Sequence, residues 1–257
     1  MSHQPVQSGA AKISAILDAL GTADASAFPE GMTVAEMSRA LDRDKSIVSR
    51  QLKSLLETEL ISRDDEGRYM LSWRLFALAS RAGDQRITRL AMPVMRRLSD
   101  TVGERSHLTV WSSDEILTVH SESSGRLIEA HDWVGRTVPA LTTASGVAMM
   151  MDHDADGVSA LAGRVDPSLT PRLRSIVADI ERSRERGYSF VTQVADPEIC
   201  GIGAPIRDFR GQIVAAINIS GPTYRIEPNR KVLADHVKAA ARGIDRTARR
   251  SPAKNDN

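Results

Sequence analysis

Residues 33–57 constrain the fold more tightly than any other stretch, because they predict two short helices separated by only three residues. Thr33 and Glu36 have the spacing of a capping box, in which the hydroxyl and the carboxylate each accept a hydrogen bond from the other residue's amide. The sequence DRD (42–44) follows, and Asp44 is suited to cap the second helix. Two short helices joined by a tight turn are the helix-turn-helix pattern.

The second helix, residues 45–57, has two unlike faces. Its apolar residues share one face at i, i+3/i+4 and i+7 spacing, and its hydroxyl-bearing and basic residues share the other. From 45 to 54 the second face carries no acidic residue, although solvated helical faces usually mix both charges. Arginine and lysine contact guanine edges and phosphates, whereas an acid would repel the DNA backbone. We therefore expect this helix to be a DNA-recognition helix.

A two-stranded hairpin is expected directly after these helices. Residues 60–71 run from an apolar arm through a polar tip at Gly67 to a second apolar arm, with Arg63 and Arg68 on the arms. With the amphipathic segment 11–21 in front, three helices and a hairpin predict a winged helix-turn-helix. The predicted DNA-contacting residues are Thr33, Lys45, Ser46, Ser49, Arg50, Lys53, Arg63 and Arg68.

Position rather than bulk charge supports DNA binding. Residues 1–85 hold ten Lys and Arg against twelve Asp and Glu, and the whole chain has a formal net charge of only +1. For the second helix taken alone, a solvated face that is cationic by chance is the alternative. The capping box, the three-residue turn and the basic hairpin, found in this order, favour DNA binding over that alternative.

Length and cysteine content bound the class of protein. At 257 residues the chain can form two domains with separate cores. Its single cysteine, Cys200, excludes an internal disulfide and a thiolate zinc cluster. The first ten residues lack the regions of a secretion signal, and no apolar run approaches the roughly 18–20 residues of a membrane span. We expect a cytoplasmic protein with no membrane partner and no cofactor.

After the hairpin the sequence first has helical periodicity and then alternates between strand and helix patterns. Residues 72–100 are helical by spacing, in two pieces with a possible hinge at Gly83 and Asp84. The remainder alternates strands and helices and predicts a mixed sheet flanked by helices. The predicted boundaries are 9–72 for the DNA-binding domain, 73–86 for a linker helix, 87–250 for the second domain and 251–257 for a disordered tail.

Four segments carry a family resemblance. They are MTVAEMSRALDRDKSIVSRQLKSLLETELISRDDEGRYMLS (32–72), PALTTASGVAM (139–149), GYSF (187–190) and GIGAPIRDFRGQIVAAINISGP (201–222). Together they resemble the isocitrate lyase regulator (IclR) family of bacterial transcription factors, over about residues 9–248. Each segment alone would be a weak signal, and the combination is specific.

The resemblance implies an α+β protein, in which a winged helix-turn-helix is joined by a linker helix to a GAF-like α/β domain for effector binding and oligomerisation. It also implies ligand-responsive control, more often repression, by homodimers or dimers of dimers on palindromic double-stranded DNA operators. Two alternatives stay open: a ligand-independent DNA-binding protein whose second domain only dimerises, and an enzyme with a GAF-like domain. The chain lacks the G-x-S-x-G, H-E-x-x-H and Walker motifs, so no catalytic residue is predicted.

The resemblance further implies where an effector binds. The matching positions are Ala144, Ser145, Gly146, Val191, Gly201, Asn218 and Ser220. Many members have an acid where Val191 stands and a cysteine where Gly201 stands, so this pocket would be roomier and less polar. We therefore expect an effector less polar than a bare keto acid, with aromatic compounds as candidates. Trp111, Trp133 and Phe190 are candidate wall residues, although packing in an aromatic-poor core is the alternative for each.

Two further features are interpreted as structural. Cys200 lies one residue from the family cysteine position, and the interval from Gly187 to Asp208 favours a register in which Cys200 faces away from the pocket. DHDADG (152–157) mimics the start of a calcium loop, but its twelfth position is Gly163 instead of glutamate, so no calcium site is expected. The histidines of the second domain have no close metal-ligand spacing, which predicts no metal site but leaves zinc with distant ligands open: His107, His120, His131, His153 and His236.

Overall fold

The computed structural model describes residues 8–22, 31–79, 85–127, 130, 132–192 and 198–250. The chain divides into two compact units, Met1–Gln85 and Arg86–Asn257, each with its own hydrophobic core. The predicted hinge at Gly83 and Asp84 and the predicted tail at 251–257 lie outside the described residues.

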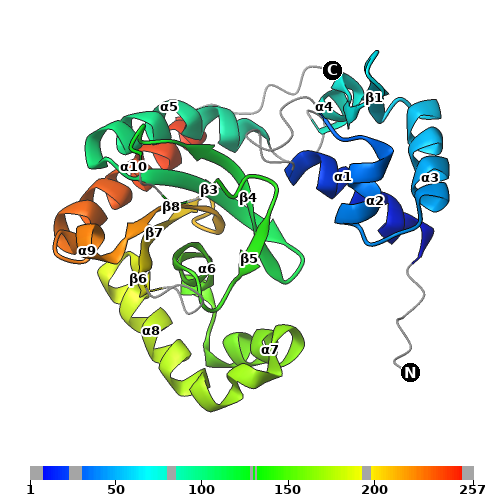
Figure 1. The fold of residues 1–257 in the computed structure, drawn as a ribbon. Coiled ribbons are helices and arrows are strands. Elements are labelled where there is room, and N and C mark those ends of the chain that lie inside the picture. Colours follow the sequence, from blue (N-terminus) through cyan, green and yellow to red (C-terminus); the bar gives the residue numbers. More distant parts are fainter. Residues whose placement is uncertain are drawn as a thin grey trace, which may run out of the picture. The chain divides into compact units, whose positions relative to one another are not determined.

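The first unit is a winged helix-turn-helix (Figure 1). Its elements are α1 (Gly9–Thr22), α2 (Val34–Ala40), α3 (Lys45–Glu57), β1 (Ile61–Arg63), β2 (Tyr69–Leu71) and α4 (Trp73–Ala79). Its core is built from the apolar faces of the three helices and the inner residues of the hairpin, including Ile16, Met37, Val48, Leu52 and Ile61. The 3.6-residue spacing of these side chains is what turns each helix toward the common core.

The predicted capping box at the start of α2 is present. The Thr33 amide donates to Glu36 Oε2 at 2.8 Å, and the Glu36 amide donates to Thr33 Oγ1 at 3.3 Å. The hydrogen bonds that the Thr33 amide and the Thr33 hydroxyl donate to the Glu36 carboxylate lower the pKa of Glu36. Asp44 occupies the predicted N-cap position of α3, and its side chain makes no capping hydrogen bond there.

The wing is the antiparallel pair β1–β2, in which Ile61 lies opposite Leu71. Gly67 at its tip has φ +83°, a left-handed conformation that glycine adopts without steric cost. Tyr69 is buried and forms an isolated bridge with Met32, which attaches the wing to the chain before α2. The Arg63 guanidinium stacks 5.3 Å from the centroid of the Tyr69 ring, and this cation–π contact orients the first arm.

The second unit is built on a six-stranded sheet of order β5-β4-β3-β8-β7-β6 (Figure 1). Its elements are α5 (Gln85–Val102), β3 (Arg105–Ser112), β4 (Glu115–Glu122), β5 (Thr137–Pro139), α6 (Ala144–Met149), η1 (Met150–Asp152), α7 (Ala155–Val165), η2 (Pro167–Arg172), α8 (Leu173–Arg186), β6 (Ser189–Thr192), β7 (Ile199–Arg207), β8 (Ile213–Pro222), α9 (Thr223–Ile226) and α10 (Arg230–Arg250). All described neighbours pair antiparallel, so the predicted mixed sheet is wrong. The sheet consists of two three-stranded meanders, β3-β4-β5 and β6-β7-β8, which pair with each other through β3 and β8. In this arrangement each described strand is antiparallel to its neighbours.

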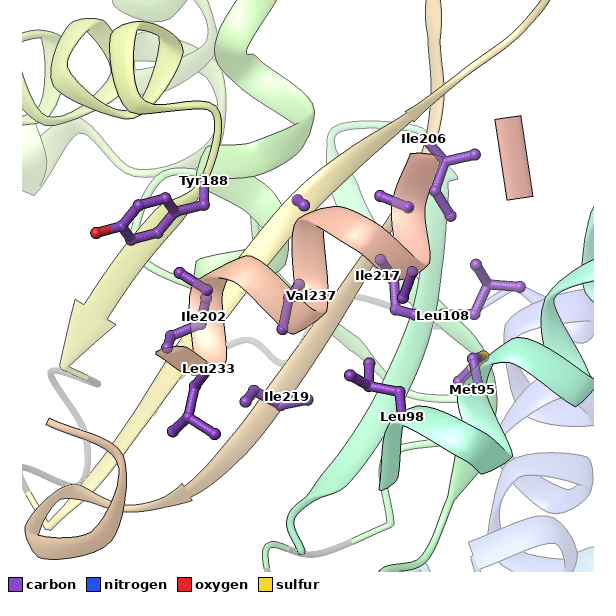
Figure 2. Close-up of a cluster of buried hydrophobic side chains, with 14 of the residues drawn as sticks. Met95, Leu98, Leu108, Tyr188, Ile202, Ile206, Ile217, Ile219, Leu233 and Val237 are labelled. Atoms are coloured by element: carbon purple, nitrogen blue, oxygen red, sulfur yellow. The ribbon is translucent and has the colours of Figure 1, made fainter. Parts of the chain in front are cut away.

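Helices α5 and α10 cover one face of this sheet. Figure 2 shows Leu233 and Val237 of α10 next to Ile202 of β7 and Ile219 of β8, with Met95 and Leu98 of α5 on the other side of Ile219. The side chains of this cluster are almost all aliphatic, and most are fully buried. Burial of this apolar area is the main force that holds the two helices on the sheet.

Helices α6, α7 and α8 lie on the opposite face, which is curled around α6 (Figure 1). Met149, Met150 and Met151 at the end of α6 are fully buried there, together with Ile116 of β4 and Ile180 of α8. Along β8 the side chains alternate between the two faces, because successive residues of a strand point in opposite directions. The face under α6 is therefore the one on which the polar residues of β8 lie.

Candidate ligand pocket and nucleic-acid interface

A cavity of about 350 Å³ opens between the sheet and the start of α6. Ligand pockets usually have volumes of about 300–1,000 Å³, so this one suits a small organic molecule. All six strands of the sheet and the β5–α6 connection contribute residues to it, and the contribution of β7 is Gly201, which has no side chain. Its described lining residues are His107, Thr109, Thr118, Trp133, Thr137, Val138, Pro139, Thr142, Thr143, Ala144, Ser145, Val191, Gly201, Asn218 and Ser220.

The start of α6 is held over the strands by short polar contacts. Thr143 caps the helix, because its Oγ1 accepts from the Gly146 amide at 3.3 Å and donates to the Pro139 carbonyl at 2.7 Å. Ser189 Oγ donates to the Ala144 carbonyl at 2.5 Å. These hydrogen bonds fix the loop that closes one side of the cavity.

A hydrogen-bonded row crosses the polar wall of the cavity. His107 Nε2 lies 3.0 Å from Ser220 Oγ, and His107 Nδ1 lies 3.3 Å from Ser121 Oγ. His107 is only 3% exposed, and these two hydroxyl groups are the hydrogen-bond partners of its ring nitrogens inside the protein. Asn218 lies directly opposite His107 in the β3–β8 ladder, and its Oδ1 is buried with no hydrogen-bond partner among the described residues.

Most of the residues predicted for the pocket line this cavity. They are Trp133, Ala144, Ser145, Val191, Gly201, Asn218 and Ser220. Three others do not. A Cβ on Gly146 would lie 2.1 Å from the Ala140 carbonyl oxygen, so this glycine permits close packing of α6. Trp111 packs with the α6–α8 cluster, and Phe190 lies under the Arg230 guanidinium at 5.0 Å.

Sequence reasoning missed His107 and the ring of threonines around the cavity. His107 and Thr109 are two residues apart on β3, so both side chains point to the cavity side of the sheet. Their position became evident only from the pairing of β3 with β8, which joins segments more than a hundred residues apart. A strand pairing of this range has no local signal in the sequence.

The hydroxyl and basic face of α3 is exposed. Lys45, Ser46, Ser49, Arg50 and Lys53 are all exposed, while the apolar residues opposite them fill the core of the unit. Arg50 Nε donates to the Ser46 carbonyl at 3.3 Å, which lays the guanidinium along the helix. No acidic side chain interrupts this face over residues 45–54. The surface therefore has the charge and exposure that a duplex-binding helix needs.

Ile47 was not among the predicted DNA contacts. It lies in the first turn of α3 and is 37% exposed, although isoleucine is usually buried. Side chains in the N-terminal part of a recognition helix face base edges, where an apolar group can contact a thymine methyl. Its exposure was not evident from its position in the sequence pattern.

Two of the residues predicted to contact DNA, Thr33 and Arg68, make hydrogen bonds within the first unit. Thr33 belongs to the capping box, in which its hydroxyl also donates to Glu36 Oε2 at 2.8 Å. Arg68 donates to the Gly31 carbonyl at 3.0 Å and lies 3.5 Å from Glu36 Oε2. Arg63, in contrast, is exposed on the wing. Thr33 thus caps α2, Arg68 ties the wing to the start of α2, and Arg63 is the wing residue better placed to reach a phosphate.

Comparison with known proteins decides the family. The family model described as bacterial transcriptional regulator IclR C-terminal matches residues 80–246. The chain belongs to the IclR family. A second model, described only as HVO_A0114, matches residues 27–76, which contain the helix-turn-helix and wing.

Curated relatives of this IclR-family chain are transcriptional regulators. It is 25% identical over 225 residues to the HTH-type transcriptional regulator KdgR of Escherichia coli, covering 85% of this chain and 86% of the relative. It is 27% identical over 244 residues to BhcR of Paracoccus denitrificans, covering 90% and 86%. These matches extend over both units.

Solved structures show the same fold. An IclR homologue of Microbacterium hydrocarbonoxydans, complexed with 4-hydroxybenzoate, superposes with a TM-score of 0.75 at 21% identity, covering 95% of this chain and all of that one. The IclR of Thermotoga maritima superposes with a TM-score of 0.71 at 22% identity, covering 92% and 97%. The predicted α+β fold and the family resemblance are thereby confirmed.

Asp152, Asp154 and Cys200 have structural surroundings in this IclR-family protein. Asp152 binds Arg207 at 2.7 Å, which lowers the pKa of Asp152, and Asp154 caps α7 by accepting from the Gly157 amide at 2.8 Å. Cys200 is fully buried in the cluster under α10, on the face opposite the pocket, as the predicted register requires, and burial raises the pKa of its thiol.

The described residues hold neither a cluster of metal ligands nor a membrane-spanning helix. In the part of the chain that the structure describes, no three His, Cys, Asp or Glu side chains cluster as metal ligands. His131 lies outside that part. Of the helices described, none combines the length and hydropathy that a membrane crossing requires.

Proposed function

We propose that this IclR-family transcriptional regulator binds duplex DNA through α3 and a small organic effector in the cavity beside α6. The observation that carries the proposal is the pairing of two surfaces in one chain: an exposed, acid-free helix face and a partly open pocket of ligand size. Each surface belongs to a separate compact unit. A protein that reports a metabolite to a promoter needs both.

The DNA site should be palindromic. A homodimer presents two copies of α3 related by two-fold symmetry, so each copy would contact one half-site in adjacent major grooves. We expect Arg50 to read a guanine, with Lys45, Lys53 and Arg63 on phosphates. The expected sign of control is repression, as the name of the relative AllR of Salmonella typhi, an HTH-type transcriptional repressor, indicates for that protein. As a DNA-binding regulator of a bacterial family, the protein would act in the cytoplasm.

The effector should be a small molecule with a mostly uncharged surface, and an aromatic or other cyclic compound would fit. Val191 and Gly201 leave an apolar wall and space where a carboxylate and a larger side chain would otherwise stand. One neighbour of the same fold is complexed with 4-hydroxybenzoate, a single-ring compound, which supports this size class. Binding, not catalysis, is the proposed activity, because the relatives carry regulator names throughout.

The proposal is tested by selecting DNA sites from a random duplex pool with the full-length protein. We expect a palindromic site to emerge, and Lys45→Glu with Lys53→Glu to weaken its retention by at least about 100-fold, because reversal both removes phosphate contacts and adds repulsion. Arg174→Glu with Lys231→Glu, both exposed on the second unit, makes the same charge change and is the control. Unchanged retention by the α3 double variant would remove α3 as the DNA-binding helix.

A further inference from the structure

A second cavity lies between the end of α8, the end of β7 and α10, and it shares no described lining residue with the cavity beside α6. Its volume is about 350 Å³. Five of its twelve described lining residues are basic and two are acidic: Met151, Arg184, Glu185, Arg186, Gly187, Ala204, Pro205, Arg207, Lys238, Ala241, Arg242 and Asp245. The cavity beside α6 has no Lys, Arg, Asp or Glu among its described lining residues. The two cavities therefore suit ligands of different charge.

Three cations from two helices meet at this second cavity. The Arg186 guanidinium lies 4.7 Å and the Lys238 Nζ lies 5.5 Å from the centroid of the Tyr188 ring, which packs beside α10 (Figure 2). Arg242 follows Lys238 by four residues, so the two share one face of α10. The attraction of each cation to the ring offsets part of the repulsion between Arg186 and Lys238. The fold therefore gathers positive charge at this place.

These three cations have little compensation inside the protein. The ion pairs of the described residues include neither Arg186 nor Arg242. Arg186 donates instead to neutral oxygens, the Tyr188 carbonyl at 2.6 Å and Ser183 Oγ at 3.1 Å. Burial lowers the pKa of the Arg186 guanidinium, as expected for a charge that has no carboxylate beside it. Lys238 pairs with Asp235 at 3.0 Å, but the Asp235 side chain is 75% exposed and water screens the pair.

The acidic groups near the cavity interact mainly with Arg207. Asp245 accepts a hydrogen bond from the Arg207 amide at 2.8 Å, and Asp152 takes the Arg207 guanidinium in a bidentate pair at 2.7 and 2.8 Å. Glu185, the other acidic lining residue, is exposed to solvent. The acidic charge therefore does not neutralise the three cations.

Complementing the dipole of α8 is the structural alternative for part of this charge. Arg184 and Arg186 lie in the last turn of α8, where basic side chains interact favourably with the helix carbonyls. Lys238 and Arg242 lie in the interior of α10, far from either of its ends, and the helix dipole gives no reason for them. A shared anion accounts for the residues of both helices.

We infer that this second cavity is a phosphate-binding site, for a small organic phosphate or for inorganic phosphate. A phosphate monoester carries about 1.5–2 negative charges at pH 7 and has three strong acceptor oxygens, which suits three cations better than the single charge of a carboxylate. Guanidinium groups match phosphate oxygens in paired hydrogen bonds. The inference goes beyond the proposed function, because it concerns a separate cavity and does not depend on DNA binding.

The test is calorimetry on the full-length protein at about pH 8 and constant ionic strength, where phosphate is a dianion. The probes are ribose 5-phosphate, inorganic phosphate, ribose and acetate. Both phosphate compounds should bind at least about 10-fold more tightly than acetate, and ribose should not bind. Tighter binding of ribose 5-phosphate than of inorganic phosphate assigns the site to an organic phosphate, and equal binding assigns it to the free ion.

A double variant tests whether the cations of α10 hold the phosphate. Lys238→Gln with Arg242→Gln should weaken phosphate binding by at least about 10-fold, because two charged donors are lost. Arg174→Gln with Lys231→Gln makes the same charge change at exposed residues of the same unit that line neither cavity, and it should leave binding unchanged. Arg242→Gln alone removes an exposed side chain with no ion pair, so it should fold like the wild type and still weaken binding by about 3-fold.

A further variant separates the two cavities. Val191→Trp fills the cavity beside α6 and should leave phosphate binding unchanged.

Four results would overturn the inference. They are the absence of binding by both phosphate compounds at millimolar concentration, an equal loss in the Arg174 and Lys231 control, full binding by a folded Lys238 and Arg242 double variant, and loss of phosphate binding in a folded Val191→Trp protein. If the double variant instead weakens duplex DNA binding while no phosphate compound binds the wild type, the cations contact the DNA backbone and the phosphate site is likewise excluded.

Discussion

Helix α3 and strand β8 are both two-faced elements, but they present their polar faces to different surroundings. In α3 the polar face is exposed and rich in lysine and arginine. In β8 the polar face, Asn218 and Ser220, is buried beside a cavity and carries no charge. An open cationic face suits a large polyanion, and a buried neutral face suits a small molecule. The same binary pattern therefore serves two kinds of partner, and burial decides which.

The largest effect on stability is expected when a side chain on the apolar face of β8 is truncated. Ile217→Ala should lower the free energy of unfolding of the second unit by about 2–5 kcal/mol, because the side chain is fully buried under α10 and leaves a cavity. Guanidinium unfolding followed by tryptophan fluorescence measures this. Ser220→Ala on the other face should cost about 1 kcal/mol, the contribution of one hydrogen bond. Similar costs for the two variants would remove the contrast between the faces.

A smaller effect is expected on the polar face of α3. Arg50→Ala should weaken binding to the selected site by about 1–3 kcal/mol if Arg50 reads a base. Lys53→Ala should weaken binding to all duplexes alike, and it should reduce the slope of log affinity against log salt concentration by about 1. Fluorescence anisotropy over a salt series distinguishes the two. If Arg50→Ala weakens random and selected DNA equally, Arg50 is a phosphate contact.

Thr33 tests where the DNA-binding surface ends. Thr33→Ala should lower the stability of the first unit by about 1 kcal/mol, because the α2 capping box is lost, and Thr33→Ser should restore most of it. Thermal unfolding followed by circular dichroism gives the comparison. DNA affinity measured well below the Tm should change little, because the hydroxyl is engaged with Glu36. A large loss of affinity in a stable Thr33→Ala protein would return Thr33 to the interface.

The smallest effect concerns acid sensitivity. Hydrogen bonds from Thr33 lower the pKa of Glu36 below its ordinary value of 4.5. Since the folded-state pKa is the lower one, this stabilisation is fully present above about pH 4.5 and is lost as pH falls through the folded-state value. The Tm of the first unit should therefore fall less between pH 6 and pH 3 in Glu36→Gln than in the wild type. Parallel Tm curves would show that the capping box adds no pH dependence.

The first unit could be predicted almost completely because its signals are local. The Thr33–Glu36 spacing, the periodicity of α3 and the glycine at the wing tip each depend on a few adjacent residues. The exposure of Ile47 and the internal role of Arg68 were missed, because both depend on which atoms the folded unit leaves uncovered. Periodicity assigns a residue to a face but does not give its partners.

The second unit could be predicted only in outline. The family resemblance supplied Asn218 and Ser220 on one strand, together with the α6 loop. The antiparallel pairing of β3 with β8, which brings His107 to the same wall, is a contact between distant segments. Trp111 follows His107 and Thr109 at alternate positions but lies beyond the cavity, 6.1 Å from His153. The extent of a cavity along a strand depends on which helix covers it, and no local pattern records this.

Hydroxyl-radical footprinting of the full-length protein tests most directly the claim that α3 faces DNA and the α6 cavity faces the effector. Selected duplex DNA should protect Ile47 on α3, and a bound effector should protect Trp133 at the cavity, each without protecting the other. Exposed Phe209, at the tip of the β7–β8 hairpin, should react equally in all samples. DNA that leaves Ile47 reactive, or an effector that leaves Trp133 reactive while shielding another region, would contradict the account.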